Sequence, residues 1–347
     1  MNKKKYKIQF IFSLTLSLFS LFCMTMNLDA AEYEFKFHHF LPKTSPAHIS
    51  MIEPWVKKIE EDSSGRIKID VYPSMTLGGR PADLVSQARN GVVDLIWTSN
   101  GYTPGQFPRT ELFELPLIHT NDPEKTGAVM YEMFSEYLEE DYSGLKVLFL
   151  HVHAGNVFQS VEKEISDINS FKGMKVRTPS RTGSWTLDEL GSESISVPMP
   201  DVVQTLSKNM IDAALIPYEI IPTFKLNEYT KYQIEGYDGF RFGTLTFQVS
   251  MNKDKWNTLP DDIKEIFQAN SNLSQWKNAG NIWQMNDNDG LDYALKNGNI
   301  HKILGYNETE EIKNRLKGTH DIWLKELSKE NIDGAPILEK AMQLIGE

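Results

Sequence analysis

Apolar and polar residues alternate in two ways along the first part of the chain. Over Tyr33–Phe40 and Ile67–Val71 the period is two, which is typical of β-strands. Over Pro46–Ile59 apolar residues recur at helical spacing, and Pro81 opens a second helix that reaches about Arg89. A short apolar run at Val92–Trp97 predicts a buried strand. Strands that alternate with helices predict a mostly parallel, helix-covered α/β sheet.

The same order of elements returns in residues 171–232, after a helix near Glu124–Glu140 and a strand over Leu145–His153. Here the pattern predicts three strands, at Met174–Arg177, Ile195–Val197 and Ile211–Ile216. Two helices are predicted between them, at Gly183–Leu190 and Asp201–Lys208. Two successive α/β units in 347 residues favour two lobes, because a single core usually stops growing below this length.

The last third of the chain has a different pattern. A long strand is predicted over Phe242–Asn252, and a helical pattern runs from Pro260 to about Asp287 with only Gly280 to weaken it. Such a helix would be roughly 40 Å long, which is more than one small lobe needs. We therefore expect one long helix that spans both lobes.

The N-terminal segment differs from the rest of the chain in the order of its charged and apolar residues. Four lysines between positions 3 and 7 precede an apolar stretch from Ile8 to Met26, and Ala30 and Ala31 offer a cleavage site. This order is typical of a secretory signal peptide, which we assign to residues 1–30. An uncleaved anchor helix is the weaker alternative, because hydroxyl residues interrupt a run that is barely long enough. Cleavage removes Cys23, the single cysteine, so we expect a soluble exported chain without disulfides.

Composition and charge exclude several classes of protein. The chain is 40% hydrophobic and 24% charged, as in ordinary globular proteins, and its net charge is −11. No basic stripe interleaved with aromatic residues occurs, so no nucleic-acid partner is expected. The sequence also lacks the G-x-S-x-G, H-E-x-x-H, P-loop and G-x-G-x-x-G motifs, and we expect neither catalysis nor a cofactor.

Two pairs of histidines are candidates for a binding site. His151 and His153 point the same way on a strand and could share a metal, but no third ligand occurs at a useful spacing. The favoured interpretation is that one of them packs while the other, His153, lines a cleft, so no metal site is predicted. His38 and His39 face opposite sides of their strand, so only one of them can contribute to the same binding site as His153. We take this residue to be His39.

Arg177 is the strongest single candidate. It ends a strand, and Thr178–Pro179 forces an extended exit from that strand. Ligands of open α/β sheets bind beyond the carboxyl ends of the strands, and a guanidinium there can hold a carboxylate through two parallel hydrogen bonds. Spacing alone leaves a surface arginine in a weak ion pair equally open. Arg181 lies nearby, in a hydroxyl-rich segment that leads into a helix N-terminus, where anions are favoured.

Aromatic residues collect near the predicted strand ends. Trp97 and Tyr102 follow the third strand, Tyr218 follows Ile211–Ile216, and Phe247 lies within the long strand. Any one of them is more typical of a core, whereas several beyond one sheet edge would form an apolar pocket that orients its ligand.

Several short motifs occur in an order and spacing that resemble the DctP-type solute-binding proteins of tripartite ATP-independent periplasmic (TRAP) transporters. The motifs are GRIKIDV from Gly65, LGG from Leu77, NGVVD from Asn90, FKGMKVRTP from Phe171, MID from Met210 and MNK from Met251. The similarity runs from about Tyr33 to Asn281. Two further segments, GYTPGQFP from Gly101 and IPYE from Ile216, resemble one subgroup of that family.

This resemblance implies a two-lobed α/β fold of the periplasmic binding protein type, in which each lobe is a mixed sheet covered by helices. Lobe I would comprise residues 31–153 plus 243–282, and lobe II residues 154–242 plus 283–347. Members of the family close around an organic anion and hand it to a membrane permease. The arginine that clamps the ligand carboxylate in the family corresponds to Arg177.

The sequence departs from the family pattern at two places. Many members carry an asparagine in a D-G-Q-E-N-P motif, whereas the aligned segment here reads DAALIP and places Ile216 at that position. Tyr218 or Glu219 could substitute for the missing polar contact. A second family arginine is also absent, with His153 and Asn156 in its neighbourhood. These departures argue against assuming sialic acid or a simple C4-dicarboxylate as the ligand.

The expected function is that of a periplasmic, monomeric solute-binding subunit of a TRAP transporter, not of an enzyme. Its expected partners are a small organic anion and the cognate membrane permease subunits. The aromatic candidates favour a monocarboxylate with an apolar or planar body, such as an aromatic or keto acid, with a sulfonate as an open alternative. Two other functions stay open on sequence alone: a secreted hydrolase or lyase that uses Glu219 with His153, and a solute sensor that docks onto a receptor.

Overall fold

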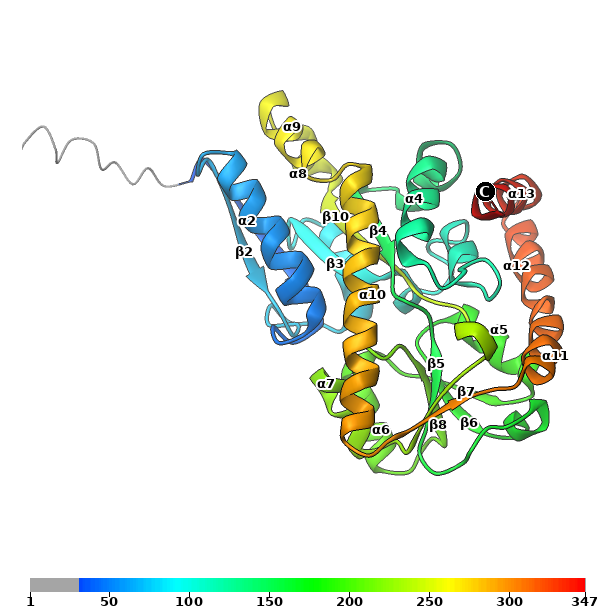
Figure 1. Cartoon of the computed structure of the whole chain (residues 1–347). Helices are drawn as coiled ribbons and strands as arrows, with labels where there is room; N and C mark the ends of the chain where they lie inside the picture. The colour runs from blue at the N-terminus through cyan, green and yellow to red at the C-terminus, as the bar shows by residue number, and fades with distance from the viewer. Residues whose placement is uncertain (1–30, 347) are drawn as a thin grey trace, which may run out of the picture.

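Residues 31–346, the part of the chain that the computed structural model describes, form two β-sheets covered by helices (Figure 1). The first sheet has the order β2-β1-β3-β10-β4, built from Tyr33–His39 (β1), Ile67–Tyr72 (β2), Leu95–Ser99 (β3), Leu145–Val152 (β4) and Thr246–Asn252 (β10). The second has the order β11-β9-β5-β8-β6-β7, built from Val157–Ser160 (β5), Lys175–Thr178 (β6), Glu193–Ser196 (β7), Ala213–Ile216 (β8), Tyr232–Glu235 (β9) and Ile300–Ile303 (β11). We call each sheet, with the helices that cover it, lobe I and lobe II respectively.

Both sheets are mixed. In lobe I, β1 is parallel to β2 and β3, whereas β10 is antiparallel to β3 and β4. In lobe II, β5 is antiparallel to β8 and β9, and the other neighbouring strands are parallel. This arrangement confirms the two-lobed α/β fold with mixed, helix-covered sheets that the resemblance implied.

Helices bury the apolar stripes of the sequence pattern against these sheets or against one another. Their bounds are Glu53–Asp62 (α2), Leu84–Arg89 (α3), Pro123–Met133 (α4), Arg181–Leu190 (α5), Val202–Ser207 (α6), Ile221–Phe224 (α7), Lys253–Thr258 (α8), Asp261–Ala269 (α9), Leu273–Lys296 (α10), Tyr306–Leu316 (α11), Gly318–Lys329 (α12) and Ala335–Gly346 (α13). The helix expected over Pro46–Ile59 begins as a π-helical turn, Ala47–Ile52, before α2. Pro54 near the start of α2 cannot donate the bond that would continue a regular α-helix from that turn.

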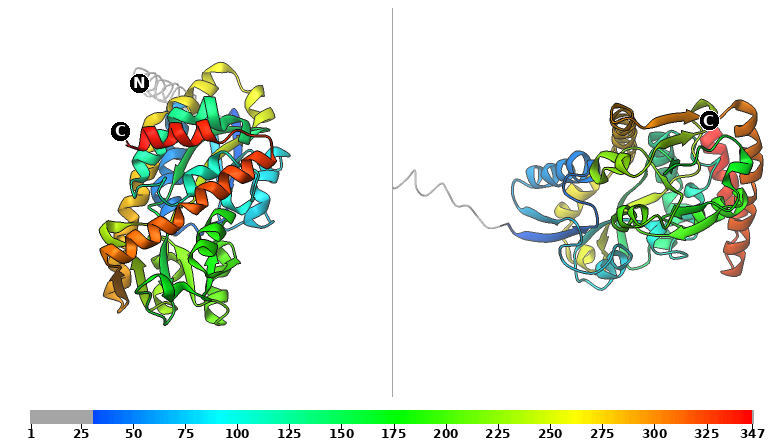
Figure 2. Two further views of the ribbon diagram at one scale, coloured as in Figure 1. Left: turned by 90° about the vertical axis from the view of Figure 1, so that its right-hand side faces the viewer. Right: turned by 90° about the horizontal axis from the view of Figure 1, so that it is seen from below.

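The chain passes between the lobes more than once. After β4 it enters lobe II through residues 153–156, and after β9 it returns through residues 236–245 to place β10 inside the lobe I sheet. Near the C-terminus, α11 and α12 pack against α5 of lobe II, and α13 packs against α4 of lobe I (Figure 2). The residue numbers at which the lobes divide stay a prediction.

Helix α10 crosses both lobes (Figure 1). It packs along α4 and β4 in lobe I and against α7 in lobe II, which confirms the long helix that was expected to span them. Its bounds differ from those expected, because the pattern that starts at Pro260 divides into α9 and α10. Asn270 ends α9, and the side chain of Asn272 caps α10 by accepting from the Ser274 N–H. Such short polar side chains bond to nearby backbone, so they end one helix and start another.

Two glycines let α10 approach the backbone of both lobes. A Cβ at Gly280 would lie 2.2 Å from the carbonyl oxygen of Pro123 at the start of α4, and one at Gly290 would lie 2.1 Å from the carbonyl oxygen of Tyr218 in lobe II. No side chain fits into a close-packed interior at such distances. The helix is therefore fixed against each lobe at one point, with residues 281–289 between the two.

The signal peptide predicted over residues 1–30 lies outside the described residues. Within residues 31–346, no helix has both the length and the apolar character that crossing a bilayer requires.

Gly290→Ala is expected to lower the free energy of unfolding by about 1–3 kcal/mol, because the new methyl group overlaps the Tyr218 backbone. Helix propensity alone predicts the opposite sign, a gain of up to about 1 kcal/mol. Chemical denaturation followed by circular dichroism measures the difference. Gly346→Ala in α13 is the control, since nothing lies within 4 Å of its Cβ. Equal effects of the two substitutions would contradict the close approach.

Candidate ligand-binding site

A narrow cavity of about 40 Å³ lies between the lobes and adjoins a wider cleft of about 1000 Å³. Its lining comes from both lobes, from the segments that connect them and from α10, and is mostly apolar. Residues predicted from the sequence line this cavity, namely Trp97, Tyr102, His153, Asn156, Arg177, Glu219 and Phe247. The fold therefore brings together side chains that are up to 150 positions apart in the sequence.

Arg177 lies in β6, between β7 and β8. Thr178 and Pro179 carry the chain out of the strand, and Ser180 caps α5 by accepting from the Gly183 N–H at 3.1 Å. Gly183 is required there, since a Cβ would lie 1.9 Å from the Thr178 Oγ1. This tight turn fixes the end of β6 and thereby the backbone of Arg177.

The Arg177 side chain is held by the protein itself. Its Nε donates to the Val197 carbonyl at 2.8 Å, and its Nη1 donates to the Leu215 carbonyl at 3.2 Å. The residue is 2% exposed, and among the described residues no carboxylate forms an ion pair with it. Burial lowers its pKa to about 10, and the neighbouring Tyr102 hydroxyl opposes this effect. The guanidinium is therefore charged at neutral pH without a counter-ion from residues 31–346.

His153 and Asn156 lie in the segment that connects β4 to β5. The Gly155 N–H donates to His153 Nδ1 at 3.0 Å, which places the imidazole proton on Nε2. Burial, together with His119 and Arg241, holds the pKa of His153 well below its ordinary value, so the ring is neutral. The His153 Nε2 and Asn156 Oδ1 atoms are buried without a hydrogen-bond partner among the described residues. They are a donor and an acceptor that a ligand can use.

Nearly parallel aromatic rings form one wall of the cavity. The Trp97 ring stacks on Phe40 at 5.0 Å and on Phe247 at 5.3 Å between ring centroids. Phe247 stacks in turn on Trp283 of α10 at 5.5 Å. This aromatic wall, formed by the four rings, offers a flat apolar surface to a planar ligand body.

Ile216 and Glu219 line the cavity from the end of β8 and the loop after it. Ile216 presents an apolar side chain at the position where many family members would place a polar one. Glu219 is 4% exposed, and burial together with the charge of Asp287 raises its pKa well above the ordinary value. Its N–H donates to Asp287 Oδ1 at 3.3 Å, and its Oε2 has no partner among the described residues. Burial therefore favours the protonated form of Glu219.

Three residues predicted for the site lie outside the cavity lining: His39, Tyr218 and Arg181. His39 is fully buried, and its Nε2 lies 2.9 Å from His48 Nδ1 on the lobe I side. Tyr218 lies beside Arg241, whose guanidinium carbon is 4.7 Å from the centre of the ring. Arg181 is turned toward lobe I. Position at a strand end predicts nearness to the cavity, but contacts with distant residues set the direction of the side chain.

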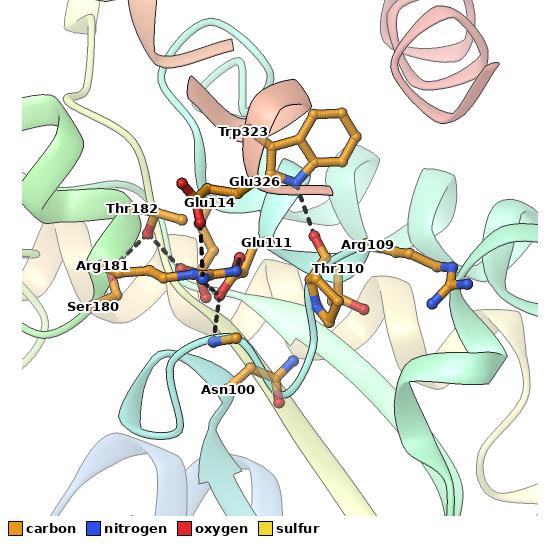
Figure 3. Close-up of polar contacts among 12 residues, drawn as sticks. Asn100, Arg109, Thr110, Glu111, Glu114, Ser180, Arg181, Thr182, Trp323 and Glu326 are labelled. Carbon is orange, nitrogen blue, oxygen red and sulfur yellow. Dashed lines mark hydrogen bonds and ion pairs between the residues drawn. The ribbon is translucent and has the colours of Figure 1, made fainter. Parts of the chain in front are cut away.

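Arg181 joins the two lobes (Figure 3). Its Nε and Nη2 donate to the two carboxylate oxygens of Glu111, at 2.8 and 2.6 Å. Next to it, Thr182 Oγ1 donates to Glu114 Oε2 at 2.6 Å, while Glu114 Oε1 accepts from the N–H and the hydroxyl of Thr246. Glu114 thus connects α5 of lobe II with β10 of lobe I. We call these five residues the interlobe cluster.

A second cluster of ion pairs lies where the chain crosses between the lobes. Arg241, in the segment that leads to β10, pairs with Asp287 of α10 at 3.0 Å and with Glu235 at the end of β9 at 3.3 Å. Asp287 also accepts from the Tyr218 N–H at 2.6 Å. The charges of this crossing cluster are compensated within it, in contrast to that of Arg177.

Sequence reasoning missed other residues that line the cavity, among them Phe40, Met199, Ile220, Leu245 and Trp283. The sequence contains a pattern from which Trp283 could have been predicted. The buried positions of α10 follow a spacing of four and three, at Trp276, Gly280, Trp283, Asp287, Gly290 and Ala294. This stripe marks the face of the helix that meets both lobes.

The described residues contain no group of three or more His, Cys, Asp or Glu side chains placed to hold a metal ion. His151, considered above together with His153, accepts from Trp97 Nε1 at 2.9 Å and packs against the aromatic wall. One histidine of this pair therefore packs, and the other lines the cavity.

Comparison with known families supplies the class of the protein. The family model DctP, described as bacterial extracellular solute-binding protein, family 7, matches residues 37–326. The chain belongs to this family. As a DctP-type TRAP solute-binding protein, it is a binding protein rather than the hydrolase or lyase considered above.

Other TRAP solute-binding proteins have the same fold. One from Rhodoferax ferrireducens T118, in complex with copurified benzoate, is 35% identical, with a TM-score of 0.87 over 90% of this chain and 97% of that chain. One from a marine metagenome, specific for aromatic acid ligands and in complex with 3-hydroxybenzoate, is 35% identical, with a TM-score of 0.88 over 91% of this chain and 98% of that chain. The 2,3-diketo-L-gulonate-binding periplasmic protein YiaO of Escherichia coli is 22% identical over 258 residues, which are 72% of this chain and 74% of its own.

The stability of this TRAP solute-binding protein is expected to depend on pH through Glu114. Burial raises the pKa of Glu114 to about 7 from 4.5. The folded state therefore binds the proton of Glu114 more tightly than the unfolded state does. The stabilisation that this proton provides is complete below about pH 4.5 and is lost as pH rises through about 7. Glutamine does not ionise, so the free energy of unfolding of Glu114→Gln lacks this pH dependence. The difference between the variant and the wild type should therefore shift in favour of the variant by on the order of 3 kcal/mol as pH rises from about 4.5 to 8.

Urea unfolding of both proteins across this pH range measures that gain. Asp141, another buried carboxyl with a raised pKa, is present in both proteins and cancels from the comparison. Glu265→Gln, at an exposed position of α9, is the control and should keep a constant difference from the wild type. A constant difference for Glu114→Gln as well would show that Glu114 is already ionised in the folded protein.

Proposed function

We propose that this protein is the periplasmic solute-binding subunit of a TRAP transporter and that it captures an aromatic monocarboxylate. One observation carries the proposal: Arg177 is buried, charged and without a carboxylate partner among the described residues, and it lines a cavity with an aromatic wall. A buried charge costs free energy unless it is paired, so this site favours an anionic ligand. The relatives that bind benzoate and other aromatic acids support the same ligand class.

The ligand carboxylate would bind to the Arg177 guanidinium, which two backbone carbonyls already orient. A planar guanidinium matches a carboxylate through two parallel hydrogen bonds. The neutral His153 would add a donor through Nε2–H. A sulfonate presents oxygen atoms of the same kind and is the alternative anion.

The body of the ligand would lie against the aromatic wall. Stacking and the burial of apolar area favour a planar ring there over a polar chain. Ile216 replaces the asparagine that many family members use for a polar contact, which again favours an apolar body. These features together favour aromatic acids over sugar acids and dicarboxylates.

Binding would be coupled to closure of the lobes. The cavity lining includes Trp97 and Tyr102 from lobe I and Arg177 and Met199 from lobe II, and the Met199 N–H donates to the Tyr102 hydroxyl at 3.1 Å. A ligand that contacts both lobes stabilises the conformation in which these contacts and the interlobe cluster form. After removal of residues 1–30, the closed monomer would present its ligand to the cognate permease from the periplasm.

Arg177→Met is expected to weaken benzoate binding by at least about 30-fold, because it removes one partner of a buried charge pair. Titration calorimetry measures the affinity, and circular dichroism verifies the fold. Benzoate at 100 times its Kd should also raise the free energy of unfolding of the wild type by about 2.7 kcal/mol, and the variant should lose this gain.

Arg66→Met is the matched control, since Arg66 pairs with Glu32 and Asp262 at the surface of lobe I. It should bind benzoate like the wild type. If folded Arg177→Met also binds like the wild type, the carboxylate is held elsewhere.

Delivery to the permease has its own test. Proteoliposomes that contain the cognate permease subunits are expected to take up radiolabelled benzoate only when the binding protein is added. Succinate added in tenfold excess should not compete. A protein that binds benzoate yet never supports uptake would instead be the solute sensor considered above.

A further inference from the structure

We infer that Glu219 and Trp283 form a second polar subsite in the cavity, which binds a hydroxyl group on the ring of the ligand. This inference rests on the proposed function, since it takes Arg177 as the group that holds the carboxylate. It narrows the ligand class from aromatic monocarboxylates to their hydroxylated members.

Helix α10 brings the two residues together. Trp283 and Asp287 are four positions apart, so they lie on the same face of the helix, one turn from each other. Asp287 Oδ1 accepts from the Glu219 N–H at 3.3 Å, which ties the loop after β8 to this turn of α10. Both Glu219 and Trp283 line the cavity.

Each of the two residues has a buried polar atom without a partner. Glu219 is 4% exposed and Trp283 is 3% exposed. The Glu219 Oε2 and Trp283 Nε1 atoms form no hydrogen bond with any described residue. Buried polar atoms are paired in the great majority of cases, because leaving one unpaired costs free energy. A ligand group that pairs with both atoms recovers this free energy.

The subsite is separate from the guanidinium. Tyr102, the neighbour of Arg177, contacts Phe40 with ring centroids 5.2 Å apart, and Trp283 lies further along the aromatic wall, with its ring 6.2 Å from Trp97 and 5.5 Å from Phe247. The charges that act on Glu219 are those of Asp287 and Arg241, not that of Arg177. A planar acid that binds Arg177 and lies along the wall therefore extends toward Glu219 and Trp283.

The chemistry of the two atoms selects a hydroxyl group. The indole N–H can only donate a hydrogen bond, and the Glu219 carboxyl oxygen can accept one. A hydroxyl accepts from the indole and donates to the acid, so one small group satisfies both. A second carboxylate would find no cation at this end, since Arg241 is already paired with Asp287 and Glu235.

The test compares benzoate with its three monohydroxy derivatives by titration calorimetry. We expect the wild type to bind at least one hydroxybenzoate at least about tenfold more tightly than benzoate. The reason is that benzoate leaves both Glu219 Oε2 and Trp283 Nε1 unpaired. In Glu219→Met, which has a similar shape but no polar oxygen, this ratio of affinities should fall to about one. In Glu219→Gln, which has a similar shape and keeps an acceptor oxygen, a ratio of at least about three should remain.

Glu228→Met, at an exposed position nine residues further along, is the matched control and should keep the wild-type ratio. If Glu219→Met does not fold, Trp283→Phe tests the same subsite, because it keeps the stacked ring and removes the N–H donor. A folded Glu219→Met or Trp283→Phe with the wild-type ratio would overturn the inference.

The outcomes for the wild type separate this inference from the proposed function. If the wild type binds benzoate but prefers none of the hydroxybenzoates, the subsite is wrong and the proposed function stands. If it binds none of the four acids, the proposed ligand class itself is wrong, and the inference falls with it.

Discussion

The guanidinium of Arg177 is a full positive charge buried between two lobes, with backbone carbonyls and a tyrosine hydroxyl around it and no carboxylate of the described chain beside it. Two other cations at the meeting of the lobes are paired, the buried Arg241 with Asp287 and Glu235, and the partly exposed Arg181 with Glu111. Those pairs hold the fold together. Burying the charge of Arg177 costs free energy, and under the proposed function an anion that enters the cavity offsets this cost by pairing with the guanidinium.

Helix α10 connects this site to the arrangement of the lobes. Gly280 and Gly290 allow it to touch the backbone of lobe I and of lobe II, and the residues between those points include Trp283 in the aromatic wall and Asp287 in the crossing cluster. A ligand that packs on Trp283 therefore contacts the same helical turn that holds the lobe crossing through Asp287. Ligand contacts and lobe positions act on one rigid element, which is how a small molecule can influence the closure of a much larger one.

Much of the fold follows from local pattern, and two of the exceptions, β5 and β9, share a cause. Strands such as β1 and β2 have one face toward the core, so their apolar residues alternate and their bounds were predicted to within about two residues. Strand β5 is buried along its whole length, and β9 nearly so, with Gln159 and Gln233 at buried positions. A short strand that is buried on both faces is recognised only by a continuous apolar run, as in β8, and a glutamine interrupts that run in β5 and β9.

The sequence by itself determined the two α/β units, the family and the position of Arg177 at the end of a strand, because periodicity, turn residues and motif order are properties of neighbouring residues. The tertiary structure alone decided which side chains reach the cavity. It turned Arg181 toward Glu111, placed Tyr218 beside Arg241 and brought Trp283 into the aromatic wall. It also left Arg177 without a carboxylate partner among residues 31–346. The direction and pairing of a side chain depend on residues far away in the sequence, and no local pattern records those contacts.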